Sequence, residues 1–216
     1  VAAAQSNGGY VVDAVCPLVT KVHHEVKVRA GKGYQIVYIG HEGHDEVIGT
    51  MGEAPAHIRL VEDEADVMNL DLPADAKVAY LTQTTLSVDD AERIIRVLRQ
   101  RFPRIVNPSK DDICYATQNR QDAVKFMAQR CDVVIVVGSP NSSNSNRLRE
   151  VAQNMGVEAH MVDSAADLKP EWIAGRPRVG VTAGASAPEV LVNESKMYKF
   201  GFRVGEILLV IVKKPG

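Results

Sequence analysis

Short apolar runs recur along the chain, separated by polar or glycine-containing segments. They predict strands at Tyr10–Val15, Gln35–Ile39, Ile58–Val61, Val78–Leu81, Ile105–Asn107, Val133–Val137, Val157–Val162 and Val179–Thr182. Most of these runs are continuously apolar, which is typical of parallel strands covered on both faces. A further run, Ile207–Val212, also predicts a buried strand and is too short to span a membrane.

Two of the segments between the strands have the spacing of amphipathic helices. In "LSVDDAERIIRVL", Ser87 is placed to cap a helix with the apolar stripe Ala91, Ile94, Ile95 and Leu98. In "NSNRLREVAQNMG", the stripe is Leu148, Val151, Ala152 and Met155, and Gly156 suits the position after the helix. Strands alternating with such helices predict an α/β fold with parallel sheets.

The chain also repeats itself at a distance of about a hundred residues. Cys16 aligns with Cys114, and "YIGHEGH" aligns with "VVGSPNS" at the same shift of 98 residues. The other aligned pairs are Gly40 with Gly138, His44 with Ser142, Val61 with Val162, Asp66 with Asp167 and Thr82 with Thr182. Several matches in the same order predict two homologous α/β units, about residues 10–103 and 104–200.

Composition narrows the class of protein. The chain of 216 residues carries 25 basic and 27 acidic residues, a balance that gives no electrostatic footprint for nucleic acid. Its three cysteines are too few for a disulfide scaffold, so a reducing compartment is favoured. No apolar run reaches the length of a membrane span, and we expect no membrane partner.

The segments that follow the predicted strands are rich in hydroxyl, amide and imidazole groups. They are "GHEGHDE", "TQTTLS", "CYATQN", "GSPNSSNSN" and "TAGASAP". Ligands of open parallel sheets bind beyond the carboxyl ends of the strands, where helix N-termini favour anions. These loops therefore suit a compact anion such as a diphosphate. The serine–asparagine run can also be a simple helix cap, and "GASA" a tight turn.

The cysteines have two interpretations. Buried cysteines are often inert packing residues, which is our expectation for Cys131. Cys16 and Cys114 occupy equivalent junctions between a strand and a helix, and CxxC spacing is absent. A single zinc ion needs more ligands, whereas widely spaced cysteines can hold an iron–sulfur cluster.

The stretch "HEGHDE" lacks the spacing of a zinc metalloprotease, because its histidines are three residues apart with a glycine between them. His44 instead suits an anion donor and Glu46 a proton source.

Together these loops resemble the LytB/IspH family of 4-hydroxy-3-methylbut-2-enyl diphosphate reductases. The stretches that carry the resemblance are "DAVCPLVTKVH", "IGHEGHDEVIGTMG", "LTQTTLSVDD", "ICYATQNRQ", "VGSPNSSNSNRL" and "GVTAGASAPEVLV". The resemblance implies a three-unit α/β trefoil around a [4Fe–4S] cluster held by three cysteines. It also implies reductive removal of the hydroxyl of an allylic diphosphate, giving isopentenyl and dimethylallyl diphosphates, with electrons from a ferredoxin- or flavodoxin-type donor.

The same resemblance implies roles for individual residues. Cys16 and Cys114 match two cluster ligands, Glu46 the proton donor, and Thr84 the threonine that helps Glu46 hold the substrate hydroxyl or water. The residues that match diphosphate-binding positions are His44, Ser142, Ser143, Asn144 and Ser186.

The chain departs from the family pattern in several places. We expect residues 1–15 to be the tail end of an absent first unit, residues 16–103 the second unit, and residues 104–216 the third, with an atypical tail from about residue 194. Val15 replaces a common threonine and Pro140 a common lysine. We therefore expect an incomplete chain that holds a cluster poorly, from a bacterial cytoplasm or a plastid stroma.

Two other functions remain open. One is a non-catalytic diphosphate-binding module that kept the anion loops. The other is a cofactor-free phosphate-ester hydrolase that uses His44 and Glu46. Neither of them needs the pair Cys16 and Cys114, so the two thiols discriminate between these functions and the reductase.

Overall fold

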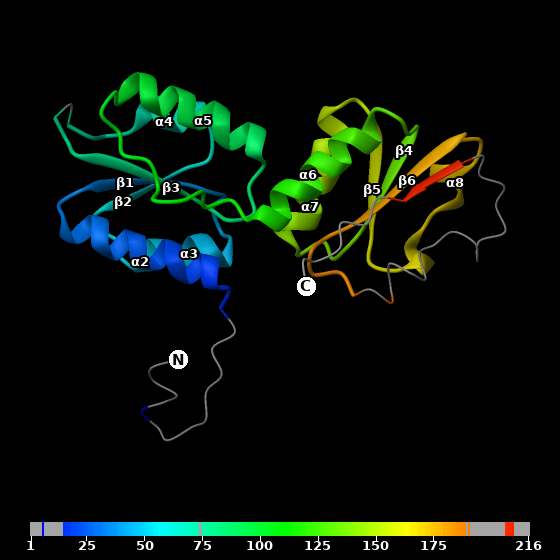
Figure 1. The fold of residues 1–216 in the computed structure, drawn as a ribbon, viewed down its shortest axis with the longest axis horizontal. Helices are drawn as coiled ribbons and strands as arrows, with labels where there is room; N and C mark the ends of the chain where they lie inside the picture. Colours follow the sequence, from blue (N-terminus) through cyan, green and yellow to red (C-terminus); the bar gives the residue numbers. More distant parts are fainter. Residues whose placement is uncertain (1–5, 7–14, 74, 189, 191–205, 210–216) are drawn as a thin grey trace. The chain divides into compact units, whose positions relative to one another are not determined.

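The chain forms two compact α/β units. The computed structural model describes residues 6, 15–73, 75–188, 190 and 206–209 (Figure 1). The N-terminal unit comprises residues 1–84 and 97–112, and the C-terminal unit comprises residues 85–96 and 113–216. Within the described residues, no helix combines the length and the apolar character needed to cross a bilayer.

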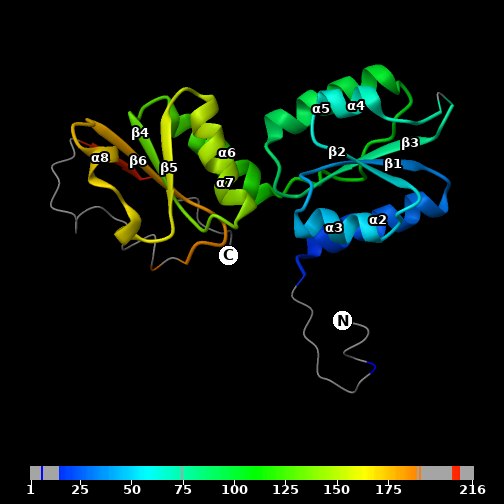
Figure 2. The same ribbon diagram turned by 180° about the vertical axis from the view of Figure 1, so that it is seen from behind.

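The N-terminal unit is built on a three-stranded parallel sheet in the order β2-β1-β3. The strands are β1 (Gln35–Ile39), β2 (Ile58–Val61) and β3 (Val78–Thr82). Helices α2 (Pro17–Gly31) and α3 (Asp45–Gly52) cover one face, and α4 (Glu64–Asn69) with the C-terminal part of α5 (Val88–Arg101) lies over the other (Figure 1 and Figure 2). Apolar side chains of α2, α3 and all three strands form one core cluster, which explains why the strands are continuously apolar.

The C-terminal unit has a four-stranded parallel sheet in the order β5-β4-β6-β7. Its strands are β4 (Val133–Val137), β5 (Glu158–Val162), β6 (Arg178–Ala183) and β7 (Glu206–Leu209). Helices α6 (Tyr115–Ala128) and α7 (Ser143–Asn154) pack on one face, and η1 (Ala165–Asp167) and α8 (Pro170–Ile173) lie on the other. Two parallel α/β units are therefore confirmed.

The predicted helices are confirmed in detail, with one correction. Ser87 caps α5, since the main-chain N–H of Asp90 donates to Ser87 Oγ at 3.2 Å. Gly156 follows α7 with φ +80°, a left-handed conformation that suits glycine. Met155, however, is 39% exposed and does not join the buried stripe of α7, because the helix ends at Asn154.

Two predicted strands need correction or fall outside the structure. Ile105–Asn107 is reduced to a single bridge between Ala79 and Val106. Pro103 and Pro108 flank this segment and lack the N–H groups that a longer ladder requires. Of the predicted strand Tyr10–Val15, residues 10–14 lie outside the described residues, and Val15 is not in a strand.

At the other end of the chain, β7 supplies the described part of the predicted strand Ile207–Val212, and residues 210–212 lie outside the described residues. Most of residues 1–15, and most of the tail after residue 194, also lie outside the described residues.

The boundary between the units also differs from the predicted one after residue 103. The N–H of Val106 donates to the carbonyl of Val78 in β3 at 3.0 Å, which keeps this segment with the N-terminal unit. In the other direction, the N–H of Val88 donates to Gln121 Oε1 at 3.0 Å, which joins the start of α5 to the C-terminal unit. The assignment of the two units to places in a trefoil stays a prediction.

The two units repeat the same hydrogen-bond pattern. The N–H of Gly40 donates to Val61 O at 3.1 Å, and that of Gly138 to Val162 O at 2.9 Å. One aligned pair is wrong by a residue. In the strand register Thr82 lies opposite Ile39 as Ala183 lies opposite Val137, so Thr82 corresponds to Ala183 and not to Thr182.

Candidate active site

The carboxylate of Glu46 is the most constrained candidate side chain in the N-terminal unit. It projects from the first turn of α3, and Thr84 follows the carboxyl end of β3. Thr84 N–H donates to Glu46 Oε1 at 2.7 Å, and Thr84 Oγ1 donates to Glu46 Oε2 at 2.9 Å. The structure thus brings Glu46 and Thr84 together.

Tyr38 is a third donor to this carboxylate, which the sequence did not reveal. Its hydroxyl donates to Glu46 Oε1 at 3.3 Å from within the buried strand β1. Burial raises the pKa of the Tyr38 phenol well above its ordinary value, and the negative charge of Glu46 raises it further. The phenol therefore stays protonated and acts as a fixed donor.

His44 begins the helix that carries Glu46. Its Nδ1 accepts a hydrogen bond from the main-chain N–H of Glu46 at 3.2 Å, so the imidazole caps α3. A neutral imidazole that accepts at Nδ1 carries its proton on Nε2. His44 Nε2 is then the ring atom that can donate to an anion.

Gln83 and Gly40 fix the loop between β1 and His44. Gln83 is fully buried, and its Oε1 accepts from the main-chain N–H of His41 at 3.0 Å. A Cβ at position 40 would lie 2.8 Å from Val47 Cγ2 and 3.2 Å from Gln83 Oε1, so only glycine fits. Gln83 was not among the residues expected at the site, although a glutamine at the end of a buried strand is a visible signal.

In the C-terminal unit, the serine–asparagine loop caps α7 and meets the loop after β6. Ser142 Oγ accepts from the N–H of Ser145 at 3.3 Å and from its Oγ at 3.0 Å, and lies 3.5 Å from Ser186 Oγ. Ser143 Oγ lies 2.9 Å from Thr85 Oγ1. The helix-cap interpretation is correct for Ser142, and the hydroxyls of Ser142 and Ser186 also lie side by side.

The loop is packed around Ser145, which the sequence analysis did not single out. A Cβ on Gly138 would approach Ser145 Oγ to 2.2 Å, and a Cβ on Gly184 would approach it to 2.1 Å. The glycine of "GASA" therefore allows a close approach to the start of α7.

Asn144 differs from its neighbours because its amide has no partner among the described residues. It is only 6% exposed, and neither Oδ1 nor Nδ2 makes a hydrogen bond with any residue that the structure describes. Leaving such a group unpaired in a protein interior costs about 1–3 kcal/mol. The amide is thus available to a ligand at the N-terminus of α7.

Cys16 and Cys114 occupy the same backbone position in their units. Each precedes the first residue of a helix, α2 or α6, with φ and ψ of −57° and 132° for Cys16 and −59° and 130° for Cys114. Neither side chain makes a capping hydrogen bond. Cys131 is 6% exposed and lies in the core between the β4 sheet and helices α6 and α7, as predicted for a packing residue.

Cys16 and Cys114 are of a residue type that could hold an iron–sulfur cluster. Neither side chain is engaged in capping its helix. Among the described residues no group of three or more His, Cys, Asp or Glu side chains could hold a metal ion. In the described part of each unit, one cysteine stands immediately before a helix, at the same backbone position.

The fold and these loops define a parallel α/β protein of a known family. Residues 1–198 match the family model described as LytB protein. The chain therefore belongs to the LytB family.

Individual relatives carry a more specific name. A 4-hydroxy-3-methylbut-2-enyl diphosphate reductase from Azoarcus sp. (strain BH72) is 63% identical over 191 residues, which cover 88% of this chain and 61% of that protein. The enzyme of the same name from Chromobacterium violaceum is 62% identical over 192 residues, which cover 89% of this chain and 62% of that protein. The chain thus spans about 61% of the length of such relatives.

A solved structure has the same fold. It is the E-1-hydroxy-2-methyl-but-2-enyl-4-diphosphate reductase from Plasmodium falciparum, which is 35% identical, with a TM-score of 0.92 over 100% of this chain and 68% of that one.

Proposed function

We propose that this chain carries the proton donor, the diphosphate loop and two cluster ligands of a 4-hydroxy-3-methylbut-2-enyl diphosphate reductase. The observation that carries the proposal is the Glu46 carboxyl, held at both oxygens by Thr84 and Tyr38 beside the capping His44. The names of the 63% and 62% identical relatives support the same substrate.

Glu46 supplies the proton that lets the substrate hydroxyl leave as water. Its Oε1 accepts from the main-chain N–H of Thr84, which cannot accept a proton in return. Oε2, 2.9 Å from Thr84 Oγ1, is therefore the oxygen from which a proton would be delivered. A hydroxyl can both donate and accept, so Thr84 can turn to accept from Glu46 or to donate to the substrate oxygen.

The diphosphate is held by neutral donors. Ser142, Ser143 and Ser186 offer hydroxyls, and Asn144 offers an unpartnered buried amide at the N-terminus of α7. His44 would contribute Nε2–H as a further donor to the anion. Fixed neutral donors and a helix N-terminus stabilise a charged ligand without the reorganisation that water would require.

Cys16 and Cys114 would be two of the ligands of a [4Fe–4S] cluster. When bound, such a cluster would pass on, one at a time, the two electrons of an external donor and would offer a Lewis-acidic iron; with two protons, one on oxygen and one on carbon, these electrons replace the C–O bond by C–H and release water. A ferredoxin- or flavodoxin-type protein would deliver the electrons, in a bacterial cytoplasm or a plastid stroma.

The test uses the whole protein, prepared anaerobically. We expect a brown protein that contains iron and sulfide and converts the allylic diphosphate to isopentenyl and dimethylallyl diphosphates when a chemical reductant is added. A colourless protein that binds diphosphates without turnover would indicate the binding module instead. Hydrolysis of phosphate esters without iron would indicate the hydrolase.

A further inference from the structure

A network of charged side chains joins helix α2 to the segment 107–112 within the N-terminal unit. Lys21 Nζ lies 2.5 Å from Asp112 Oδ1 and 3.0 Å from Glu25 Oε2, and donates to the carbonyl of Lys110 at 2.9 Å. Glu25 Oε1 in turn accepts from the N–H of Ser109 at 2.8 Å. Lys21 therefore reaches this segment through both a side chain and the main chain.

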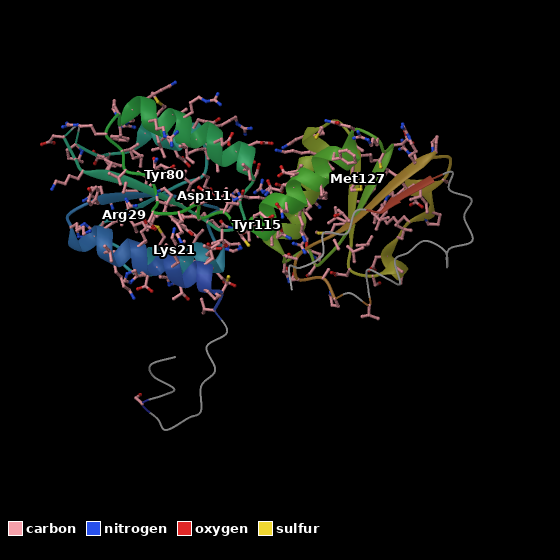
Figure 3. The ribbon with its side chains drawn as sticks, in the orientation of Figure 1. Lys21, Arg29, Tyr80, Asp111, Tyr115 and Met127 are labelled. Atoms are coloured by element: carbon pink, nitrogen blue, oxygen red, sulfur yellow. The ribbon has the colours of Figure 1, made fainter. Side chains whose placement is uncertain are left out.

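The network continues at both ends of the segment. Arg29 donates to Glu25 Oε1 and to the carbonyl of Asn107, each at 2.5 Å. At the other end, Asp112 Oδ2 accepts from the main-chain N–H of Thr82 at 2.9 Å. Figure 3 marks Lys21 and Arg29 on α2 and Asp111 in the segment. Residues 107–112 are thus held on α2 and on the end of β3.

The charges in this network are largely removed from water. Asp112 is 2% exposed, and Glu25 and Arg29 are each 8% exposed. A buried ion pair contributes little net stability, because the loss of hydration offsets the attraction between the charges. The network does fix the path of the segment, because Lys21, Glu25 and Arg29 each bond a main-chain group of residues 107–110.

The network lies close in sequence to both Cys16 and Cys114. Cys16 precedes α2, and Lys21 lies five residues further on, about 7.5 Å along a helix. Asp112 comes two residues before Cys114, and two residues span at most about 7 Å of chain. The contact between Lys21 and Asp112 is therefore made close in sequence to both cysteines.

We propose that Lys21 and Asp112 are positioning residues for the iron–sulfur cluster, a role that rests on the proposed function. They hold the main chain that leads to Cys114 against the helix that begins at Cys16. Neither residue touches the reacting atoms. Their contribution is to fix the last residues before Cys114 on α2, within the N-terminal unit, before and after the cluster is bound.

The test compares Lys21→Met, Asp112→Asn and the double variant with wild type. Lys21→Met keeps the apolar stem, and Asp112→Asn keeps an oxygen for the N–H of Thr82. Lys21→Met leaves the buried charge of Asp112 without its partner, and Asp112→Asn leaves Lys21 with Glu25 alone. The double variant removes both charges of the Lys21–Asp112 pair and should recover much of the thermal stability that Lys21→Met loses. Lys125→Met is the matched control, because it breaks the 2.7 Å ion pair with Asp89 in the C-terminal unit.

Two measurements separate positioning from stability. The first is hydrogen exchange of the Ser109 amide, which donates to Glu25 Oε1 at 2.8 Å, in this chain without a cluster. It should become at least about tenfold faster in all three variants and stay unchanged in Lys125→Met. The second is the rate at which the cluster-loaded whole protein loses iron to a chelator. It should also rise about tenfold in all three variants, including the thermally recovered double variant.

The outcomes are distinct. If exchange and iron loss follow thermal stability, so that the double variant behaves like wild type, the network is merely structural and the positioning role is wrong. If wild type holds iron and the variants keep it equally well, the positioning role fails while the proposed function stands. A wild-type whole protein that binds no iron overturns both.

Discussion

Thr84 binds Glu46 twice, once through its main-chain N–H at 2.7 Å and once through Oγ1 at 2.9 Å. The main-chain bond fixes one carboxyl oxygen whatever residue stands at position 84. The hydroxyl bond reaches the other oxygen and depends on the side chain. Substitutions at position 84 can therefore separate the placing of the acid from the delivery of its proton.

Thr84→Val should keep Glu46 in place and impair proton delivery. Valine has the shape of threonine without the hydroxyl, so only the bond to Oε2 is lost. We expect turnover to fall about 10- to 100-fold with little change in diphosphate affinity. Thr84→Ser, which keeps the hydroxyl, is the control and should stay within a few fold of wild type. Steady-state kinetics on the whole protein checks both.

Glu46→Gln should remove the acid while preserving the site. The amide oxygen can still accept from Thr84 N–H, but the group cannot supply a proton at Oε2. We expect turnover to fall about 10²- to 10⁴-fold, the usual contribution of general acid catalysis. Diphosphate binding, measured by calorimetry, should remain nearly unchanged. An equal loss of binding and turnover would argue against the acid role.

Asn144→Leu should weaken diphosphate binding without weakening the fold. The Asn144 amide is buried and unpartnered, so its replacement by an apolar group of similar shape removes an unpaired polar group. We expect stability to be unchanged or raised by up to about 1 kcal/mol, and diphosphate affinity to fall about tenfold or more.

The neighbouring Asn146 provides the matched control. Its Nδ2 donates to the carbonyls of Pro140 at 2.6 Å and Ser142 at 3.2 Å. Asn146→Leu should therefore destabilise the protein. If Asn144→Leu is the more destabilising of the two, the available-amide interpretation is wrong.

Cys114→Ser should abolish cluster binding in the whole protein, because the oxygen of serine is a poor ligand for iron in such clusters. Cys131→Ala is the control. Cys131 is buried in the core, so its truncation should lower the free energy of unfolding by about 1 kcal/mol and leave iron content unchanged. Iron analysis and chemical denaturation measure the two effects. Normal iron content in Cys114→Ser would show that Cys114 is not a cluster ligand.

Glu25 should make stability depend on pH in acid. Burial alone would raise its pKa, but hydrogen bonds from Arg29, Lys21 and Ser109 lower it from 4.5 to about 2. The folded state then binds fewer protons than the unfolded state, so the stability from Glu25 is present above pH 4.5 and is lost as the pH falls toward 2.

Asp112 acts in the opposite sense. Burial raises its pKa despite the bonds from Lys21 and Thr82, so protonation of the folded state favours folding as the pH falls. Glu25→Gln isolates the first effect and should flatten the fall in unfolding free energy between pH 4.5 and 2. Chemical denaturation across this range measures it. An unchanged slope would show that other carboxylates dominate.

The sequence predicted the sheets well because their strands are buried on both faces. A run such as Val133–Val137 has no polar residue to break the pattern, and every residue of that strand is buried. The prediction failed where the apolar pattern of a segment favours a strand but its flanking residues prevent one. Ile105–Asn107 is apolar enough for a strand, but its flanking prolines leave a single bridge.

The candidate site could be predicted from the sequence only in part, because many of its contacts join residues that are distant in sequence. Helix starts are local, so the cap at Ser142 follows from nearby residues. The cap at His44 was not predicted. The partners of Glu46 and Asp112 are not local, because Thr84 lies 38 residues from Glu46 and Lys21 lies 91 residues from Asp112. Neither periodicity nor composition predicts such pairs. In the sequence Tyr38 is an ordinary strand residue, and only the fold brings its hydroxyl to Glu46.

His44 and Ser142 each accept a main-chain hydrogen bond at the first turn of the helix after the first sheet strand of their unit. Any side chain with a suitably placed acceptor can bind that main-chain N–H group. The residue at this point can therefore differ between the two units without disturbing the start of the helix. One unit offers an aromatic ring with a second nitrogen, and the other a small alcohol.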